Sequence, residues 1–237
     1  MIRSRLAAHV LLFVLGIAAP SAWAEEDGVD AEISLQGRTT QVRWNDGDTF
    51  TFRSGRYSGK TARLVGYNTL ESYGPVHRWG EWTPAELYSL AIAARDAAAE
   101  ARWACTKQPK KDTYGRLLVD CPEARRTLLE SGLAHVFAYQ STPSEADMKA
   151  QRGARSAQAG IWKKGRPEHI VTNVSADETG RVFLQVASTR TGATERRHQR
   201  HDYEACDEIC EGPAVSGSCM IFIPYAVRYS VPPVCSP

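Results

Sequence analysis

Residues 40–66 place the strongest constraint on the fold, because they alternate apolar and polar residues in short runs separated by glycine-containing turns. Such runs, rich in aromatic and β-branched side chains, are typical of β-strands. The first helical signal follows them, where Thr83, Pro84 and Glu86 form a capping box and the first turn of a helix. A cluster of strands followed by helices predicts an α+β protein with a small barrel and excludes a wound parallel sheet.

The remaining elements follow the same pattern up to about residue 166. Two further strands are predicted near 101–105 and 116–121, on either side of a polar connection. A short helix is expected over 123–131. A third helix is expected to begin with Ser144 as its cap and to end near Gly160.

The first 24 residues predict a cleaved export signal. Arg3 and Arg5 precede an apolar stretch, and Ala22 and Ala24 give the small-x-small pattern of a cleavage site. Retention as an uncleaved anchor is the alternative, although the stretch is shorter than the ~20 residues that span a bilayer comfortably. No later segment is apolar enough to cross a membrane, so we expect a periplasmic or extracellular monomer without membrane contact after cleavage.

Cysteine usage agrees with export, because an even number of cysteines in an oxidising compartment predicts disulfides. Cys105 and Cys121 end two paired strands and are expected to bridge each other. The other four are expected to form two bridges within the C-terminal region, in one of three pairings: Cys206, Cys210, Cys219 and Cys235. A zinc site is the alternative for the tail, with His198 and His201 beside its first two cysteines.

Charge is distributed by region. Residues 40–166 contain 20 Lys and Arg against 13 Asp and Glu, a balance of +7, whereas residues 25–39 carry −4 and residues 167–237 carry −3. We interpret the first of the acidic segments as a flexible lead-in and the second as a small, disulfide-braced appendage. A basic domain between acidic flanks favours a polyanionic partner such as nucleic acid. An ordinary solvated surface explains the charge equally well.

Five residues in the basic region have the chemistry needed to cleave a phosphodiester: Asp46, Asp48, Arg63, Glu71 and Arg116. Arginine supplies forked, permanently charged donors for the non-bridging oxygens of the phosphate. A glutamate within hydrogen-bond reach of water can accept its proton. Carboxylate oxygens are the ligands that a hard cation such as Ca²⁺ prefers. Each segment is common by itself, but their order and spacing together are far more specific.

These segments, together with their spacing, resemble the thermonuclease (staphylococcal nuclease-like) family over residues 40–164. The matching text runs D-G-D-T, R-L-V-G-Y-N-T-L-E, T-P-A-E, D-T-Y-G-R, G-L-A-H-V and G-I-W. The resemblance implies a five-stranded OB-type barrel with three helices. It also implies Ca²⁺-dependent hydrolysis of DNA and RNA with little sequence specificity.

By position, the resemblance assigns Arg63 and Arg116 to the phosphate and Glu71 to the role of general base. It assigns the metal to Asp48, to Asn68 in the place of a second carboxylate, and to the backbone carbonyl of Thr69. Leu70 stands where the family has a proline. Because Asn68 offers a carbonyl oxygen without formal charge, we expect weak calcium binding, on the order of 10⁻⁴–10⁻³ M.

Three aromatic residues have open roles. Tyr114 is predicted to stack on or hydrogen-bond the nucleotide, and Tyr139 is predicted either to do the same or to pack in the core. His77 is interpreted as a packed or exposed histidine rather than an alternative base.

Two other functions remain open. The neutral Asn68 favours a catalytically inactive OB-type module that binds nucleic acid or protein. The other possibility is that the C-terminal region is the functional part and the barrel only carries it.

Overall fold

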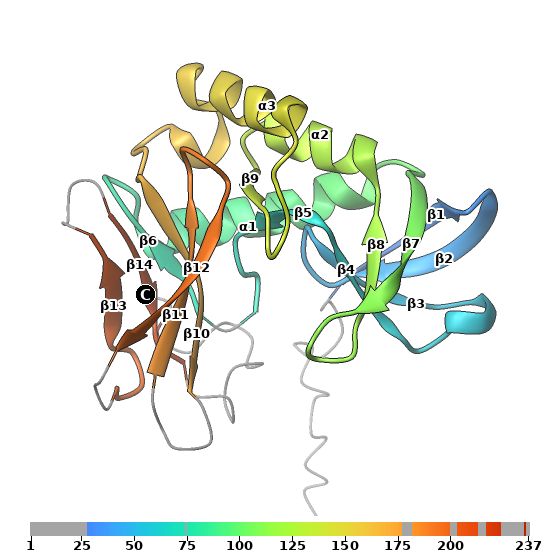
Figure 1. Ribbon diagram of the computed structural model, residues 1–237, viewed down its shortest axis with the longest axis horizontal. Helices are drawn as coiled ribbons and strands as arrows, with labels where there is room; N and C mark the ends of the chain where they lie inside the picture. Colours follow the sequence, from blue (N-terminus) through green and yellow to red (C-terminus); the bar gives the residue numbers. More distant parts are fainter. Residues whose placement is uncertain are drawn as a thin grey trace, which may run out of the picture.

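The computed structural model describes residues 28–73, 75–176, 182–199, 203–212, 217–223 and Cys235, and the predicted export signal lies outside them. The protein is a mixed α+β structure, as predicted. A barrel lies at one end, the C-terminal strands lie at the other, and the helices run between and across them (Figure 1). No helix in this described part is long and apolar enough to span a membrane.

The barrel is closed and has six strands rather than the five that were expected. Their hydrogen-bonded order is β1 (Val29–Leu35), β2 (Arg38–Trp44), β3 (Thr49–Phe52), β4 (Thr61–Leu64), β8 (Leu117–Asp120) and β7 (Ala104–Lys111). A short 3-10 turn, η1 (Gly55–Tyr57), lies between β3 and β4. β1 pairs antiparallel with β2 and parallel with β7, and this second pairing closes the barrel.

The additional strand comes from the segment predicted to be a flexible lead-in. That prediction is wrong for residues 29–35, which alternate between the two faces of a strand. Ile33 and Leu35 are buried in the barrel, whereas Asp30 and Glu32 are exposed. The two acidic side chains of the strand therefore point outward, and Asp30 pairs with Arg43 at 3.1 Å. The acidic net charge of the segment concealed the alternation of inward-facing and outward-facing residues that is typical of a strand.

The barrel interior is filled by aromatic and aliphatic side chains from β1, β2, β3, β4 and β8, and β7 contributes the buried Cys105. Phe50 lies edge-on to both Trp44 and Phe52, with ring centroids 5.1 Å apart in each pair. This is a favourable geometry for aromatic rings. The barrel is therefore a packed core, and its chemistry must lie on its rim.

Three α-helices pack beside the barrel: α1 (Pro84–Ala99), α2 (Pro122–Glu130) and α3 (Glu145–Ser156). The predicted capping box of α1 is confirmed, because Thr83 and Glu86 bond each other's backbone N–H groups. The predicted cap of α3 is also confirmed, since the Ser144 hydroxyl accepts from the N–H of Asp147 at 3.0 Å. The 3-10 turn η2 (Gly160–Trp162) follows α3.

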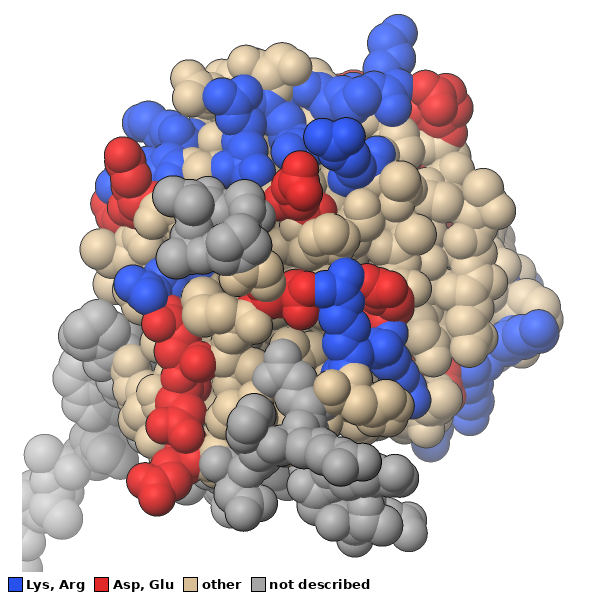
Figure 2. All heavy atoms as spheres, turned by 60° about the vertical axis from the view of Figure 1, so that its left-hand side comes forward, with Lys and Arg blue, Asp and Glu red and all other residues tan. Residues whose placement is uncertain are grey.

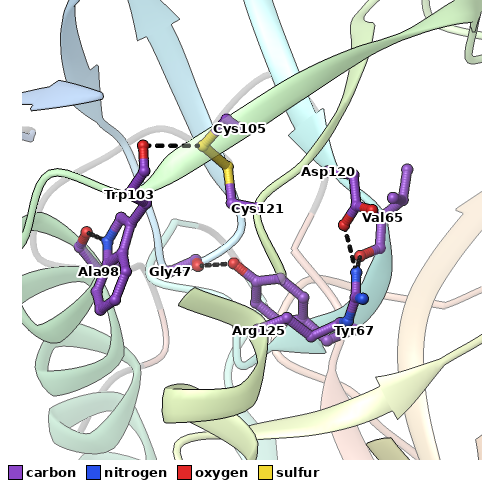
Figure 3. Close-up of a disulfide and its surroundings, with 9 residues drawn as sticks. All are labelled: Gly47, Val65, Tyr67, Ala98, Trp103, Cys105, Asp120, Cys121 and Arg125. Carbon is purple, nitrogen blue, oxygen red and sulfur yellow. Dashed lines mark hydrogen bonds and ion pairs between the residues drawn. A yellow bond between two sulfur atoms is a disulfide. The ribbon is translucent and has the colours of Figure 1, made fainter. Parts of the chain in front are cut away.

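The predicted bridge between Cys105 and Cys121 is confirmed and joins β7 to the start of α2 (Figure 3). The prediction of two bridges within the tail is also confirmed, with Cys206 bonded to Cys235 and Cys210 bonded to Cys219. These bonds remove the thiolates that the alternative zinc site required. His201 of that alternative lies outside the described residues.

The C-terminal region forms two three-stranded sheets. One contains β10 (His169–Ala176), β11 (Val182–Ser188) and β12 (Thr194–Gln199). The other contains β13 (Glu208–Glu211), β14 (Ser218–Ile221) and β6 (His77–Arg78), so that its third strand comes from the region before α1. A separate pair, β5 (Gly66–Thr69) and β9 (Ala134–Phe137), lies between the barrel and these sheets (Figure 1).

The contribution of β1 can be tested by truncating one inward-facing side chain. Ile33 has no exposed surface, so Ile33→Ala should lower the free energy of unfolding by about 2–5 kcal/mol. Glu32→Ala, on the outward face of the same strand, should change it by no more than about 0.5 kcal/mol. Urea denaturation measures both values. Equal small effects would show that residues 29–35 are not part of the barrel.

Candidate active site

The candidate site begins at the tight turn between β2 and β3. Gly47 is at its centre, where a Cβ atom would lie 2.5 Å from the Thr69 side chain and 3.0 Å from that of Ala94. Only glycine allows the turn to approach β5 and α1 so closely. The Tyr67 hydroxyl donates to the Gly47 carbonyl at 2.9 Å (Figure 3). The turn is therefore held rigidly against β5.

The Asp48 carboxylate is buried and fully engaged. One oxygen contacts the Arg63 guanidinium and accepts from the Thr49 hydroxyl at 3.0 Å. The other accepts from the Thr69 N–H at 2.7 Å and from the Thr69 hydroxyl at 3.2 Å. A buried carboxylate needs this degree of compensation, because an unpaired charge away from water is very costly.

Arg63 extends from β4, and both terminal nitrogens of its guanidinium are engaged. One Nη contacts Asp48, and the other donates to the side-chain oxygen of Asn68. Its guanidinium also lies over the Phe137 ring, 5.7 Å from the centroid. Two of the predicted metal ligands thus converge on the arginine that was predicted to hold phosphate.

Arg116 enters from the hairpin between β7 and β8. Asp112 positions it by accepting from its Nε at 2.6 Å and from its backbone N–H at 2.8 Å. Repulsion from Arg116 contributes to lowering the pKa of Arg63, after the larger effect of burial. The two arginines therefore lie within electrostatic range of each other, and two cations that repel each other favour binding of an anion.

Asp46 lies within electrostatic range of both arginines. It accepts from the N–H of Asp48 at 2.9 Å, which shapes the turn. Burial raises the pKa of the Asp46 carboxyl to about 6, against the opposing effects of Arg63 and Arg116. Asp46 therefore contributes both to the turn and to the charge of the site.

Glu71 follows β5 and is half-buried. Its charge opposes the lowering of the Arg63 pKa that burial causes, so its carboxylate lies within electrostatic range of the Arg63 guanidinium. The Glu71 N–H donates to Nε2 of His77 at 3.4 Å. His77 is fully buried, and burial followed by repulsion from His135 lowers its pKa to about 3. It is a packed, neutral histidine that contacts the Glu71 segment, as interpreted from the sequence.

The C-terminal region holds this segment from the other side, which the sequence did not predict. In β6, His77 pairs with Met220 and Arg78 with Cys219, both in β14. The N–H of Ile221 donates to the Val76 carbonyl at 2.9 Å, and Arg78 makes a forked contact with Glu208. A two-residue strand gives almost no sequence signal.

Two exposed tyrosines flank the arginines. Tyr114 is 70% exposed, and the Arg116 guanidinium lies 5.5 Å from the centroid of its ring. Tyr139 is 40% exposed and stacks on Phe137, with centroids 6.4 Å apart. Its exposure argues against the alternative of core packing. Both rings have a face or edge available to a flat ligand such as a nucleobase.

The oxygens assigned to the metal have the chemistry that a hard cation prefers. They come from the carboxylate of Asp48, the side-chain oxygen of Asn68 and the carbonyl of Thr69, which accepts from the Asn68 amide at 2.5 Å, and Asp46 adds a second carboxylate in the same turn. All are oxygen donors, as Ca²⁺ prefers. Among the His, Cys, Asp and Glu side chains of the described part, only Glu208, Cys210 and Cys219 cluster as three potential ligands, and both cysteines are in a disulfide. The candidate metal site thus depends on neutral oxygens as well as on carboxylates.

Neither the protein-family profiles nor the curated proteins with which the sequence was compared match it. The geometry of the site therefore carries the functional argument.

The buried histidines predict how stability depends on pH. Burial lowers the pKa values of His77 to about 3 and of His135 to about 4, from 6.5. Below pH 6.5 the unfolded chain therefore binds more protons, and the folded state should lose stability as the pH falls. Asp46 acts in the opposite sense, because burial raises its pKa from 3.8 to about 6. Between these pH values the folded state binds more protons than the unfolded chain, so this group adds stability as the pH falls.

A histidine variant separates these effects. His77→Phe should reduce the slope of unfolding free energy against pH, between pH 6.5 and 4.5, by up to about 1.4 kcal/mol per pH unit. Urea denaturation at several pH values measures the slope in both proteins. Identical slopes would mean that His77 is not held neutral in the folded state.

Proposed function

We propose that the protein is an exported, metal-dependent nuclease with an OB-type barrel, which hydrolyses phosphodiester bonds of DNA, RNA or both with little sequence preference. The observation that carries the proposal is the convergence of Arg63, Arg116 and Glu71 on the turn that contains Asp46 and Asp48. A module that only binds nucleic acid has no use for a glutamate beside its phosphate-binding arginines. The three disulfides favour an oxidising, non-cytoplasmic location.

In this proposal, the two arginines bind the non-bridging oxygens of the scissile phosphate and stabilise the charge that grows on them in the transition state. Glu71 accepts a proton from water as the new P–O bond forms and the ester P–O bond breaks. Tyr114 and Tyr139 contact the nucleotide. A bound Ca²⁺ would be held by Asp48, Asn68 and Thr69, and would supply further charge neutralisation and orient the water.

One observation favours the inactive binding module instead. Arg63 already neutralises Asp48 and engages Asn68, so the arrangement is satisfied without a cation or a phosphate. An assay on denatured DNA, with calcium titrated and a chelator control, separates the two functions. Degradation that the chelator abolishes would establish the enzyme, whereas binding without degradation at any calcium concentration would establish the module.

Glu71→Gln tests the general base directly. The amide keeps the shape of the side chain but cannot accept the proton, so turnover should fall by about 10²-fold or more. Glu100→Gln makes the same chemical change at an exposed position after α1 and should leave turnover unchanged. Initial rates on denatured DNA, with melting temperatures as a check on folding, provide the measurement. Near-normal turnover in Glu71→Gln would place the base elsewhere.

Asn68→Asp tests the metal site. The new carboxylate would face the Thr69 carbonyl, to which the Asn68 amide now donates, so the protein without calcium should be destabilised. Calcium should relieve this repulsion, and its half-saturation concentration should fall because a charged ligand has been added. The readout is the melting temperature against calcium concentration.

Asn173→Asp is the matched control, because its amide bonds a serine in β10 rather than a site residue. It should leave the calcium dependence of the melting temperature unchanged. A half-saturation concentration for Asn68→Asp that equals or exceeds the wild-type value would remove Asn68 from the ligand set.

A further inference from the structure

A second concentration of arginines lies away from the candidate active site, at the C-terminal end of α3. Arg152, Arg155, Ser156 and Arg166 line a hollow of about 410 Å³. Lys and Arg side chains gather at the top of the molecule in the space-filling view, where α3 lies (Figures 1 and 2). None of the lining residues belongs to the site built around Arg63.

Arg155 is held in place within this hollow. One Nη donates to the Thr189 carbonyl at 3.3 Å, and the guanidinium lies 5.4 Å from the centroid of a Trp162 ring. Its Nε is buried, yet it has no hydrogen-bond partner among the described residues. A buried donor without a partner is costly and is uncommon in folded proteins. The position of the side chain is thus fixed while one of its donors remains unused.

The surrounding charges do not neutralise the cluster. Arg152 pairs with Glu145 at 2.6 Å, and Arg190 lies 3.5 Å from Glu168. In the described part of the chain, Arg155 and Arg166 form no ion pair with an acidic side chain. After burial, repulsion from Arg166 and Arg190 is the main cause that lowers the pKa of Arg155, and Glu168 opposes it only partly.

The chemistry of the hollow selects a tetrahedral oxyanion. Guanidinium groups present paired N–H donors that match phosphate oxygens, and a serine hydroxyl adds a further donor. No carboxylate lines the hollow, so an anion entering it meets donors only. An anion would relieve the repulsion among the arginines.

We propose that this hollow is a second phosphate-binding subsite, which holds the backbone of a single-stranded polynucleotide at a distance from the scissile phosphate. The identity of the polymer rests on the proposed nuclease function, whereas the preference for phosphate rests on the arginines themselves. Such a subsite contributes affinity without reading base sequence, because phosphate contacts carry no sequence information.

Binding of a fluorescent oligothymidylate, measured by anisotropy over a range of salt concentrations with a chelator present, tests the subsite. Arg152→Gln/Arg166→Gln removes two exposed charges and leaves the anchored Arg155 in place. It should weaken binding several-fold and reduce the salt slope by about 0.7 for each phosphate that the variant no longer neutralises. Arg38→Gln/Arg53→Gln removes two exposed charges from the barrel and should leave the slope unchanged.

Arg155→Lys provides an independent variant, because it keeps the charge but loses the forked donors. It should also weaken binding, with a smaller change of slope. Equal binding by the wild type and both subsite variants would overturn the proposal, as would equal weakening by the control. A wild-type protein that neither binds nor degrades the oligonucleotide would instead refute the proposed function.

A second arm uses inorganic phosphate at matched ionic strength in place of the oligonucleotide. Phosphate that raises the melting temperature of the wild type, with no effect of the variants on oligonucleotide binding, would assign the hollow to a free anion. That result would also overturn the polynucleotide subsite.

Discussion

The buried carboxylate of Asp48 is the point on which the candidate site depends. Its two oxygens are bonded by groups from β3, β4 and β5, so that one side chain joins two strands of the barrel to the separate β5–β9 pair. An ionised group without water requires these partners, and removing any of them would leave a charge uncompensated. The positions of Arg63 and Thr69 are therefore fixed by their contacts with the buried Asp48 carboxylate, independently of any ligand.

This arrangement gives Arg63 two possible partners. In the structure, its fork is occupied by Asp48 and Asn68, and it acts as the internal counter-ion of the site. The proposed function requires the same fork to face a phosphate, which becomes favourable when another cation takes over the neutralisation of Asp48. Metal and substrate would then bind with positive coupling. A cation on Asp48 releases Arg63 for the phosphate, and a phosphate on Arg63 leaves Asp48 free to bind the cation.

The sequence predicted the features that depend on local rules. The caps at Thr83 and Ser144 and the turn around Gly47 follow from side chains within a few residues of one another. The strand at residues 29–35 was missed because its net charge concealed the alternation of Ile33 and Leu35. The pairing of β6 with β14 was missed for a different reason, because it is fixed by contacts between residues far apart in the chain.

That long-range pairing has a consequence for the order of assembly. A chain emerges from the ribosome with its N-terminus first, so the barrel and the segment that carries Glu71 exist long before β14 has been made. Until then, the backbone around Val76 and His77 lacks the strand that holds it in the finished protein. The candidate site is completed last, from the far end of the chain, and a truncated product would have the arginines without the strand that holds the segment following Glu71.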